Sequence, residues 1–314
     1  MLKTKLLTVS ILFFALFLFG CKEKEEEVHT DSFITFTDSL KRTVSIQGKP
    51  KNVVALTGSL ADIWQLSGGE IAATADDAWS ELGLSLGNAV NIGGAHSPNF
   101  ELILSVNPDL VIASASNSSN VALLDSFTGA GINVAYFDIN NFDDYLNALD
   151  ICTDITGNKG KYNENGLKLE ERIKNILTNY KNENISENKK KILILRASSG
   201  GVKVKSSDLL LGGMLKDFGC NNIADSNSSL LDNLNVESII KEQPYHIFVV
   251  TMGDDTEKAK NNVTKMFEEN PAWSTLNAVS NGRIHIMDKK LFNLKPNSKW
   301  AEAYEILYNI LQAD

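Results

Sequence analysis

Cysteine and histidine are scarce in this chain, which limits the chemistry open to it. The 314 residues include three cysteines and four histidines. Cys152 and Cys220 are single residues in helix-like segments, so we expect buried small hydrophobes, although a disulfide between them is also possible. The histidines, at positions 29, 96, 246 and 285, are scattered, without a carboxylate–imidazole cluster. The sequence therefore predicts no metal site.

Short catalytic motifs are missing as well. The chain contains no G-x-S-x-G, H-E-x-x-H, C-x-x-C, G-x-G-x-x-G or P-loop pattern. We therefore expect a binding protein and not an enzyme, with a hydrolase of scattered catalytic residues as an alternative. The formal net charge of −9 argues against nucleic acid and against an anionic membrane surface as partners.

An apolar run near the start of the chain is too short to cross a membrane as a helix. It covers residues 6–19, whereas a spanning helix needs about 20 apolar residues. Two lysines before it and a small residue before Cys21 are typical of a signal peptide. Leu18-Phe19-Gly20-Cys21 resembles the lipobox of bacterial lipoproteins, in which the cysteine is acylated. We expect a signal peptide over 1–20, and a lipidated Cys21 with a flexible tether over 21–32.

One short stretch occurs twice, half a chain apart. Asn99-Phe100-Glu101-Leu102-Ile103 and Asn235-Val236-Glu237-Ser238-Ile239 each lead to a proline and an apolar run. Asparagine is a good N-cap, a first-turn glutamate suits the helix dipole, and proline ends the helix. Each copy therefore predicts a helix followed by a buried strand, with one carboxylate at the same position in two similar lobes. A two-fold symmetric partner could bind both, although such glutamates are also stabilised without a partner.

The rest of the chain alternates strand-like and helix-like segments, which predicts mainly parallel sheets with helices on both faces. A hairpin over 33–46 comes first, and the next strand-like segments are 53–56, 71–74, 90–92, 110–113 and 134–137. A second series covers 191–195, 202–205, 247–250 and 283–287, closed by an amphipathic helix over 300–311. Residues 161–181 carry leucine and isoleucine at helical spacing without proline, so they predict a long connecting helix.

The sequence thus predicts an α/β protein of two Rossmann-like lobes, bridged by a single long backbone helix. The expected divisions are an N-terminal lobe over 33–140, connecting helices over 141–188 and a C-terminal lobe over 189–314. A helix between lobes is stiffer than two or three crossing strands. We therefore expect limited closure on binding.

Several motifs together resemble a known family. They are Thr37-Asp38-Ser39, Arg42-Thr43-Val44, Ile92-Gly93-Gly94, Pro98-Asn99-Phe100-Glu101, Asn107-Pro108-Asp109-Leu110, Pro271-Ala272-Trp273 and Asn281-Gly282-Arg283-Ile284. From about Phe33 to Leu311, the chain resembles the substrate-binding lipoproteins of ABC importers for ferric siderophores, haem and cobalamin. Lys41 and Tyr245-His246 depart from the family pattern.

The resemblance implies a monomeric, extracytoplasmic protein that is attached to the cell membrane only by its lipid. It would deliver a small metal chelate to a permease dimer with its ATPase, and would bind no nucleic acid. In the family, the glutamate of each repeat docks on arginines of one permease copy, and Glu101 and Glu237 match those positions. A sensor subunit or surface adhesin on the same fold is an alternative.

In open α/β sheets the ligand lies outside the carboxyl ends of the strands, so loops of both lobes should contact it. The residues that we expect there are Ser59, Trp79, His96, Arg196, Lys203, Lys205, Met252 and Phe292. Arg196 could form a cationic wall with Lys203 and Lys205, or could form a salt bridge inside its lobe. Trp79 and Phe292 could stack on a flat ligand, or could pack inside the protein.

The three cations favour a ferric siderophore as ligand, with cobalamin and haem as alternatives. We expect no resident cofactor. His96 and Met252 are candidate ligands to haem iron, because imidazole and thioether are both axial ligands. A histidine in a glycine-rich loop is, however, more often an ordinary surface group.

Overall fold

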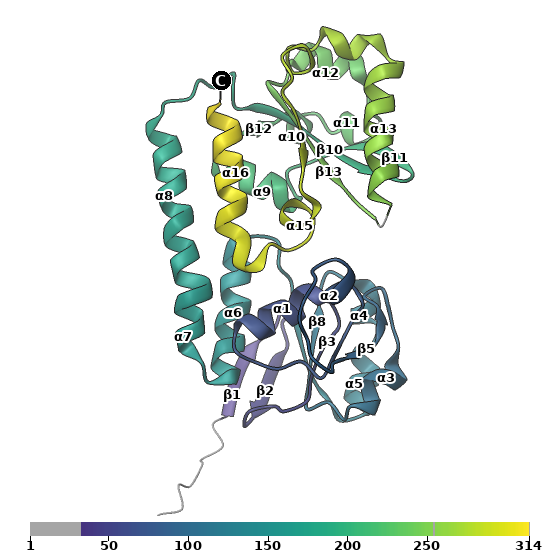
Figure 1. Cartoon of the computed structure of the whole chain (residues 1–314), viewed down its shortest axis with the longest axis vertical. Coiled ribbons are helices and arrows are strands. Elements are labelled where there is room, and N and C mark those ends of the chain that lie inside the picture. Colours follow the sequence, from purple (N-terminus) through teal and green to yellow (C-terminus); the bar gives the residue numbers. More distant parts are fainter. Residues whose placement is uncertain (1–32, 254, 314) are drawn as a thin grey trace, which may run out of the picture. The chain divides into compact units, whose positions relative to one another are not determined.

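The computed structural model describes residues 33–253 and 255–313. The predicted signal peptide, the lipidated Cys21 and the tether lie outside these residues. Residues from Phe33 onward form one unit, which contains two separate five-stranded sheets with helices around them (Figure 1). The predicted α/β fold with two lobes and a long connecting helix is confirmed.

The sheet of the first lobe is parallel throughout, in the order β5-β4-β3-β8-β9. Its strands are β3 (Val53–Ala55), β4 (Ala73–Thr74), β5 (Val90–Asn91), β8 (Leu110–Ser114) and β9 (Asn133–Phe137). Two antiparallel hairpins accompany it, β1 (Phe33–Thr37) with β2 (Thr43–Gln47), and β6 (Gly93–Gly94) with β7 (Ser97–Pro98). The helices of this lobe are α1 (Gly58–Leu66), α2 (Asp77–Ser80), α3 (Phe100–Ser105), α4 (Ser118–Val121) and α5 (Leu124–Gly129).

The connection between the lobes is helical, as predicted. It consists of α6 (Phe142–Thr156), α7 (Lys159–Tyr162), a π-helical turn (Asn163–Leu167) and α8 (Lys168–Asn182). Gly157 ends α6 in the left-handed conformation, with a φ of 69°. The chain therefore turns back at this point, and the helical run from α7 to α8 continues toward the second lobe.

The sheet of the second lobe is mixed. Its strands are β10 (Lys191–Ser198), β11 (Gly201–Lys205), β12 (Asn221–Asn222), β13 (His246–Thr251) and β14 (Ile284–Met287). β12 and β13 run parallel to β10, and β14 runs parallel to β13, whereas β11 is antiparallel to β10. The two-residue loop Ser199-Gly200 explains this difference, because only antiparallel neighbours can be joined by so short a turn.

Helices of four to fourteen residues surround this second sheet. They are α9 (Leu210–Asp217), α10 (Ile223–Ser226), α11 (Ser229–Asp232), α12 (Val236–Glu242), α13 (Thr256–Glu269), α14 (Asn277–Ser280) and α15 (Lys289–Phe292). Single 3-10 turns cover Pro271–Thr275 and Asn297–Lys299. The last described helix, α16 (Trp300–Gln312), lies beside α8 and not on the second sheet (Figure 1).

The two repeats adopt the same local structure, as predicted. The Asn99 side chain accepts a hydrogen bond from the backbone N–H of Glu101 at the start of α3 (2.9 Å). The Asn235 side chain accepts one from Ser238 at the start of α12 (3.1 Å). In each copy the isoleucine two residues after the glutamate is fully buried, and a buried strand follows, β8 or β13.

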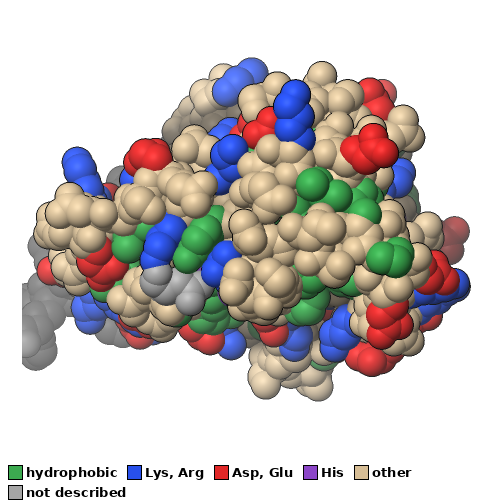
Figure 2. All heavy atoms as spheres, turned by 90° about the horizontal axis from the view of Figure 1, so that it is seen from above, with side chains coloured by type: hydrophobic (Ala, Val, Ile, Leu, Met, Phe, Trp, Pro, Cys, Tyr) green, Lys and Arg blue, Asp and Glu red, His purple; other side chains and the backbone are tan. Residues whose placement is uncertain are grey.

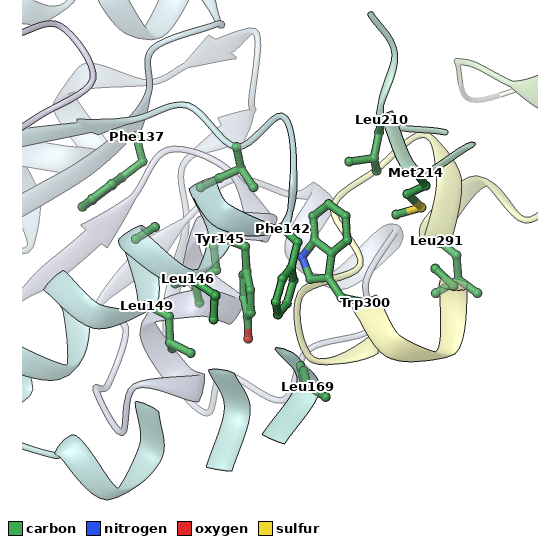
Figure 3. Packing of buried hydrophobic residues seen from close by; sticks show 14 of the residues in the cluster. Phe137, Phe142, Tyr145, Leu146, Leu149, Leu169, Leu210, Met214, Leu291 and Trp300 are labelled. Carbon is green, nitrogen blue, oxygen red and sulfur yellow. The ribbon is translucent and has the colours of Figure 1, made fainter. Parts of the chain in front are cut away.

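One hydrophobic cluster runs through both lobes and the connecting helices. It includes Ile112 of β8, Phe142 of α6, Ile194 of β10 and Trp300 of α16. The indole of Trp300 is fully buried, 5.7 Å from the Phe142 ring and 6.4 Å from the Tyr145 ring (Figure 3). Two further clusters cover the opposite faces of the two sheets. The lobes therefore share a core and are not independent bodies on a linker.

The segment before α16 adds a second connection between the lobes. Asn297 is fully buried, and its side-chain amide donates to the Ser59 carbonyl (2.9 Å) and to the Asp62 carboxylate (2.8 Å) on α1. Lys295 donates to the backbone carbonyl of Ile139, after β9. The chain thus returns from the second lobe to the first before α16 begins. This crossing, absent from the sequence-based expectation of a single bridging helix, further restricts movement of the lobes.

Cys152 and Cys220 are both free and buried, as small hydrophobes would be. Burial raises the pKa of each thiol to about 12, so neither is a reactive thiolate at neutral pH. Over residues 33–253 and 255–313, no helix combines the length and apolar character needed to cross a membrane.

The buried carboxyl of Asp62 makes the fold sensitive to pH. Burial raises the pKa of Asp62, although Asn297 and Lys299 act in the opposite direction. The folded chain therefore holds this proton more tightly than the unfolded chain does. This contribution to stability is complete below the pKa of the unfolded chain, and is lost as pH rises through the raised pKa.

We expect Asp62→Asn to stabilise the protein at neutral and alkaline pH, since it removes the buried charge and keeps an acceptor for Asn297. Thermal unfolding at about pH 8 should shift upward by about 2–4 °C, corresponding to about 1 kcal/mol, and the gain should vanish near about pH 3. Asp125→Asn, at an exposed first-turn position of α5, is the matched control and should at most lower the melting temperature slightly, because it removes a charge that suits the helix dipole. A lower melting temperature for Asp62→Asn across this range would contradict the argument.

Candidate functional site

The carboxyl ends of β3 and β4 are fixed to each other by a close backbone approach. A Cβ on Gly58, at the start of α1, would lie 2.6 Å from backbone atoms of Ala78 in α2, so only glycine fits. The backbone N–H of Gly58 donates to the Asp77 carboxylate (2.9 Å). Burial is the main cause that raises the pKa of Asp77, and the neighbouring carboxylates Asp76 and Glu81 act in the same direction. Ser59 and Trp79 are held partly exposed at this edge.

His96 lies exposed on the turn between β6 and β7. Two asparagine side chains from the loop and helix after β8 hold this turn, because Asn117 (2.8 Å) and Asn120 (2.9 Å) both donate to the carbonyl of Ala95. Asn120 also accepts a hydrogen bond from the backbone of Ser114 at the end of β8. The loops after β5 and β8 therefore form one rigid edge, with the imidazole of His96 at its surface.

Three cations of the second lobe lie on one face of the β10–β11 hairpin, which we call the cationic hairpin (Arg196, Lys203 and Lys205). Arg196 stands directly opposite Lys203 in the antiparallel ladder, and directly opposed side chains share a face. Lys205 is two residues beyond Lys203 and therefore points the same way. The structure thus brings together the three cations that the sequence suggested.

The cationic hairpin carries uncompensated positive charge. Burial, followed by the charges of Arg196 and Lys203, lowers the pKa of Lys205, because nearby like charges disfavour its protonated form. Within the part of the chain that the structure describes, no acidic side chain forms an ion pair with any of them. The alternative that Arg196 serves a salt bridge inside its lobe is not observed among these residues. A cluster of cations without acidic partners attracts anions.

Met252 and Phe292 differ sharply in accessibility. Met252 follows β13, is 46% exposed, and is tied to β10 by a hydrogen bond from its N–H to the Ala197 carbonyl (2.8 Å). Phe292 is only 1% exposed, because its ring fills the shared core between the lobes. This burial favours the alternative that Phe292 packs inside the protein, and its contact with a ligand stays a prediction. Trp79 is half-buried against the same cluster.

Lys289 joins the two lobes directly at this edge, a role that the sequence analysis missed. Its ammonium lies 2.7 Å from the carboxylate of Glu81, just after α2, and donates to the carbonyl of Gly253 (3.0 Å) after β13. The side chains are only 14% and 26% exposed. Glu81 and Lys289 lie 208 positions apart, so no local sequence pattern predicts their contact. Each residue only follows a strand and a short loop. The contact shows that the carboxyl ends of the two sheets face each other here.

Glu101 and Glu237 occupy equivalent, exposed positions in the first turns of α3 and α12. Leu102 and Leu104, beside Glu101, are each 38% exposed. The end of the molecule that carries α12 shows acidic and basic side chains dispersed between uncharged areas, without a field of one sign (Figure 2). A partner that contacted this end, where Glu237 lies, would therefore depend on particular contacts and not on overall charge.

Comparison with known proteins agrees with this geometry. The family model described as periplasmic binding protein matches residues 53–291, and the chain belongs to this family. The chain is thus a substrate-binding protein, and the predicted resemblance to importer substrate-binding proteins is confirmed.

Two curated relatives come from Bacillus subtilis strain 168. The Fe(3+)-citrate-binding protein YfmC is 26% identical over 263 residues, which cover 82% of this chain and 79% of that protein. The uncharacterized ABC transporter substrate-binding lipoprotein YvrC is 24% identical over 295 residues, or 90% of this chain and 89% of that protein. Among solved structures, Staphylococcus aureus SirA complexed with staphyloferrin B shares the fold, with a TM-score of 0.70, 20% identity, and coverage of 88% of this chain and 98% of SirA.

We expect the Lys289–Glu81 ion pair to stabilise the folded protein. Exposed pairs contribute about 0–1 kcal/mol and breaking buried ones costs about 3–5, so this half-buried pair should contribute about 1–2 kcal/mol. A double-mutant cycle of Glu81→Gln and Lys289→Met, followed by urea unfolding, measures that coupling free energy directly. The exposed pair Arg172–Glu305 (2.6 Å) serves as the control cycle and should couple more weakly. Additive effects of Glu81→Gln and Lys289→Met would disprove the stabilising role.

Proposed function

We propose that this substrate-binding protein captures an anionic ferric complex and presents it to the permease dimer and ATPase of an ABC importer. The cationic hairpin is the observation that carries the proposal, because it places three like charges on one face of the second sheet. In an open α/β sheet the ligand lies outside the carboxyl ends of the strands, which is where the side chain of Arg196 stands near the end of β10. A neutral ligand would leave the mutual repulsion of the three cations in place. An anionic ligand relieves it.

The oxygen donors of ferric carboxylate and catecholate complexes suit these side chains. Guanidinium offers paired donors to oxygen anions, and ammonium groups add charge without fixed direction. The name of the relative YfmC, which binds Fe(3+)-citrate, supports a complex of this charge type. In our proposal Ser59, Trp79, His96 and Met252 contact the remainder of the ligand, because each lies at least partly exposed in a loop or helix start after a strand.

Removal of Arg196 should weaken capture of the anionic complex. Hydrogen bonds to charged groups contribute about 1.5–3 kcal/mol, so Arg196→Ala should raise the dissociation constant for ferric citrate about 10- to 100-fold. Added salt should weaken binding to the natural protein and affect the variant less. Fluorescence or calorimetric titration measures both effects.

Arg172→Ala is the matched control, because Arg172 is an exposed arginine of α8 that pairs with Glu305 far from the hairpin. It should leave the dissociation constant unchanged. Salt-insensitive binding of cobalamin or haem, together with no response to ferric citrate or ferric siderophores, would reject the anionic complex as ligand.

We further propose that Glu101 and Glu237 dock on the permease. Both carboxylates are exposed, and neither forms an ion pair with a residue that the structure describes. Each stands at the same position of an equivalent helix, so a two-fold partner with one cation per subunit matches both. The exposed Leu102 and Leu104 provide apolar surface around the first of these contacts.

The variant Glu101→Ala with Glu237→Ala should bind its ligand normally and fail in transport. Loss of one member of a desolvated interface pair costs about 2–5 kcal/mol, so uptake of the iron complex should fall at least about tenfold. Glu171→Ala with Glu302→Ala, which removes exposed first-turn glutamates of α8 and α16, is the control and should support full uptake. Full uptake by the Glu101/Glu237 variant would mean that these carboxylates only stabilise their helices.

A lipid on Cys21 completes the proposal. The relative YvrC is named a lipoprotein, which supports an anchor of this kind. A tethered protein searches only the membrane surface for its permease, which raises the effective concentration of the docking glutamates.

A further inference from the structure

One cation of the second lobe differs from the cationic hairpin because a carboxylate of the first lobe neutralises it. Lys289 is the first residue of α15, and its ammonium lies 2.7 Å from the Glu81 carboxylate. An ammonium group carries three hydrogens, and the carbonyl of Gly253 (3.0 Å) accepts a second of them. The pair thus joins a cation at the carboxyl end of one sheet to an anion at the carboxyl end of the other.

Lys289 follows directly from the face of the second sheet that carries Arg196. Arg196 lies beside Val250 of β13, and Val250 lies beside Met287 of β14, so these side chains form one row across parallel strands. Adjacent strands are about 4.8 Å apart, so the row measures about 10 Å. Met287 precedes Lys289 by two residues, and Leu291 of α15 belongs to the same hydrophobic cluster as Val250. The long side chains of Arg196 and Lys289 can therefore reach one ligand between them.

The ion pair also lies between two residues of the proposed ligand site. Glu81 is two residues beyond Trp79, and Gly253 directly follows Met252. The side chains of Lys289 and Glu81 are 14% and 26% exposed, so the pair is open to solutes on one side. A ligand that contacts Trp79 and Met252 therefore meets the ammonium and the carboxylate together.

An anionic ligand and Glu81 compete for the same ammonium group. The oxygen anions of a ferric complex are attracted to Lys289, but the Glu81 carboxylate already accepts a hydrogen bond from it. The ligand is also repelled by Glu81 for as long as this carboxylate stays in place. The backbone of Lys289 is anchored by α15, whose Leu291 and Phe292 are buried. Glu81, which can rotate about its side-chain bonds, is therefore the member of the pair that leaves.

We propose that Glu81 is an internal competitor of the ligand, which holds Lys289 until an anionic complex displaces it. The complex then contacts Lys289 in addition to the cationic hairpin. This inference rests on the proposed capture of an anionic ferric complex. Displacement also breaks a direct contact between the lobes, so ligand binding and this contact exclude each other. A ligand gains from Lys289 only when it binds the ammonium more strongly than Glu81 does, which favours complexes of high negative charge.

Titration with ferric citrate tests the competition in the natural protein, Glu81→Gln, Lys289→Met and the double variant. Glu81→Gln should bind ferric citrate at least about fivefold more tightly, because no ion pair has to be broken first. Lys289→Met should bind it at least about twofold more weakly, because a charge-assisted contact is lost. In the Lys289→Met background, Glu81→Gln should leave the dissociation constant unchanged, since no ammonium remains for which the glutamate competes.

Asp76→Asn and Lys290→Met are the matched controls. Asp76 is an exposed carboxylate beside α2, and Lys290 is the exposed neighbour of Lys289 in α15. Each removes a charge from the same region and leaves the ion pair intact, so the dissociation constant should change by no more than about twofold. Thermal unfolding adds a second measurement. Glu81→Gln should melt at a lower temperature and yet bind more tightly, a combination that damage to the fold does not produce.

Three results would overturn the competition while ferric citrate still binds and Arg196→Ala still weakens it. Affinity changes in the same direction in Glu81→Gln and Lys289→Met would mean that the pair only holds the lobes together. A gain from Glu81→Gln that persists without Lys289 would mean that the glutamate only repels the ligand. Unchanged affinity in Glu81→Gln would mean that the ligand does not reach the pair. A natural protein that does not bind ferric citrate would reject the competition too, and no response to ferric siderophores either would reject the proposed function itself.

Discussion

The packing of Trp300 in the shared core holds the two lobes together. Its indole bridges α6 and α16, and a row of aromatic rings continues from it through Tyr304 and Phe218 to Tyr180 on α8. Removal of a buried tryptophan side chain commonly costs about 3–5 kcal/mol. Because these rings come from the connecting helices, α9 and α16, movement of one lobe against the other would expose apolar surface along the whole row. This packing favours the limited closure that the sequence analysis predicts.

Local rules explain why some features could be predicted from the sequence. The repeat was visible because an N-cap asparagine, a first-turn glutamate and a helix-ending proline act within a few residues of one another. The same holds for the cationic hairpin, since alternation with period two places Lys203 and Lys205 on one face whatever surrounds them. The connecting helix predicted over 161–181 also follows from spacing alone, and it corresponds to the run from α7 to α8 that begins after Gly157 has ended α6.

Other features depend on contacts between distant segments and leave no local pattern. Phe292 follows a strand as a ligand-contacting residue would, yet its ring is taken up by the core, because α15 packs inward where the chain leaves the second sheet. The ion pair of Lys289 with Glu81 joins residues that only the completed fold brings close. The crossing at Asn297 is likewise invisible in sequence, since an asparagine after a proline resembles any turn. Side-chain identity predicts these residues' chemistry, and three-dimensional packing decides their neighbours.

The place of α16 in the chain has a consequence for synthesis. Residues 300–312 leave the ribosome after both sheets have done so, and the indole that completes the common core is the first residue of that helix. Until it emerges, each sheet can form its own hydrogen bonds, but the apolar sides of α6, α8 and α9 lack the cover that α16 gives them. Contacts between residues far apart in the sequence form slowly, and until they form the chain is only partly folded. A nascent polypeptide of this design therefore completes its common core only after residues 300–312 have emerged.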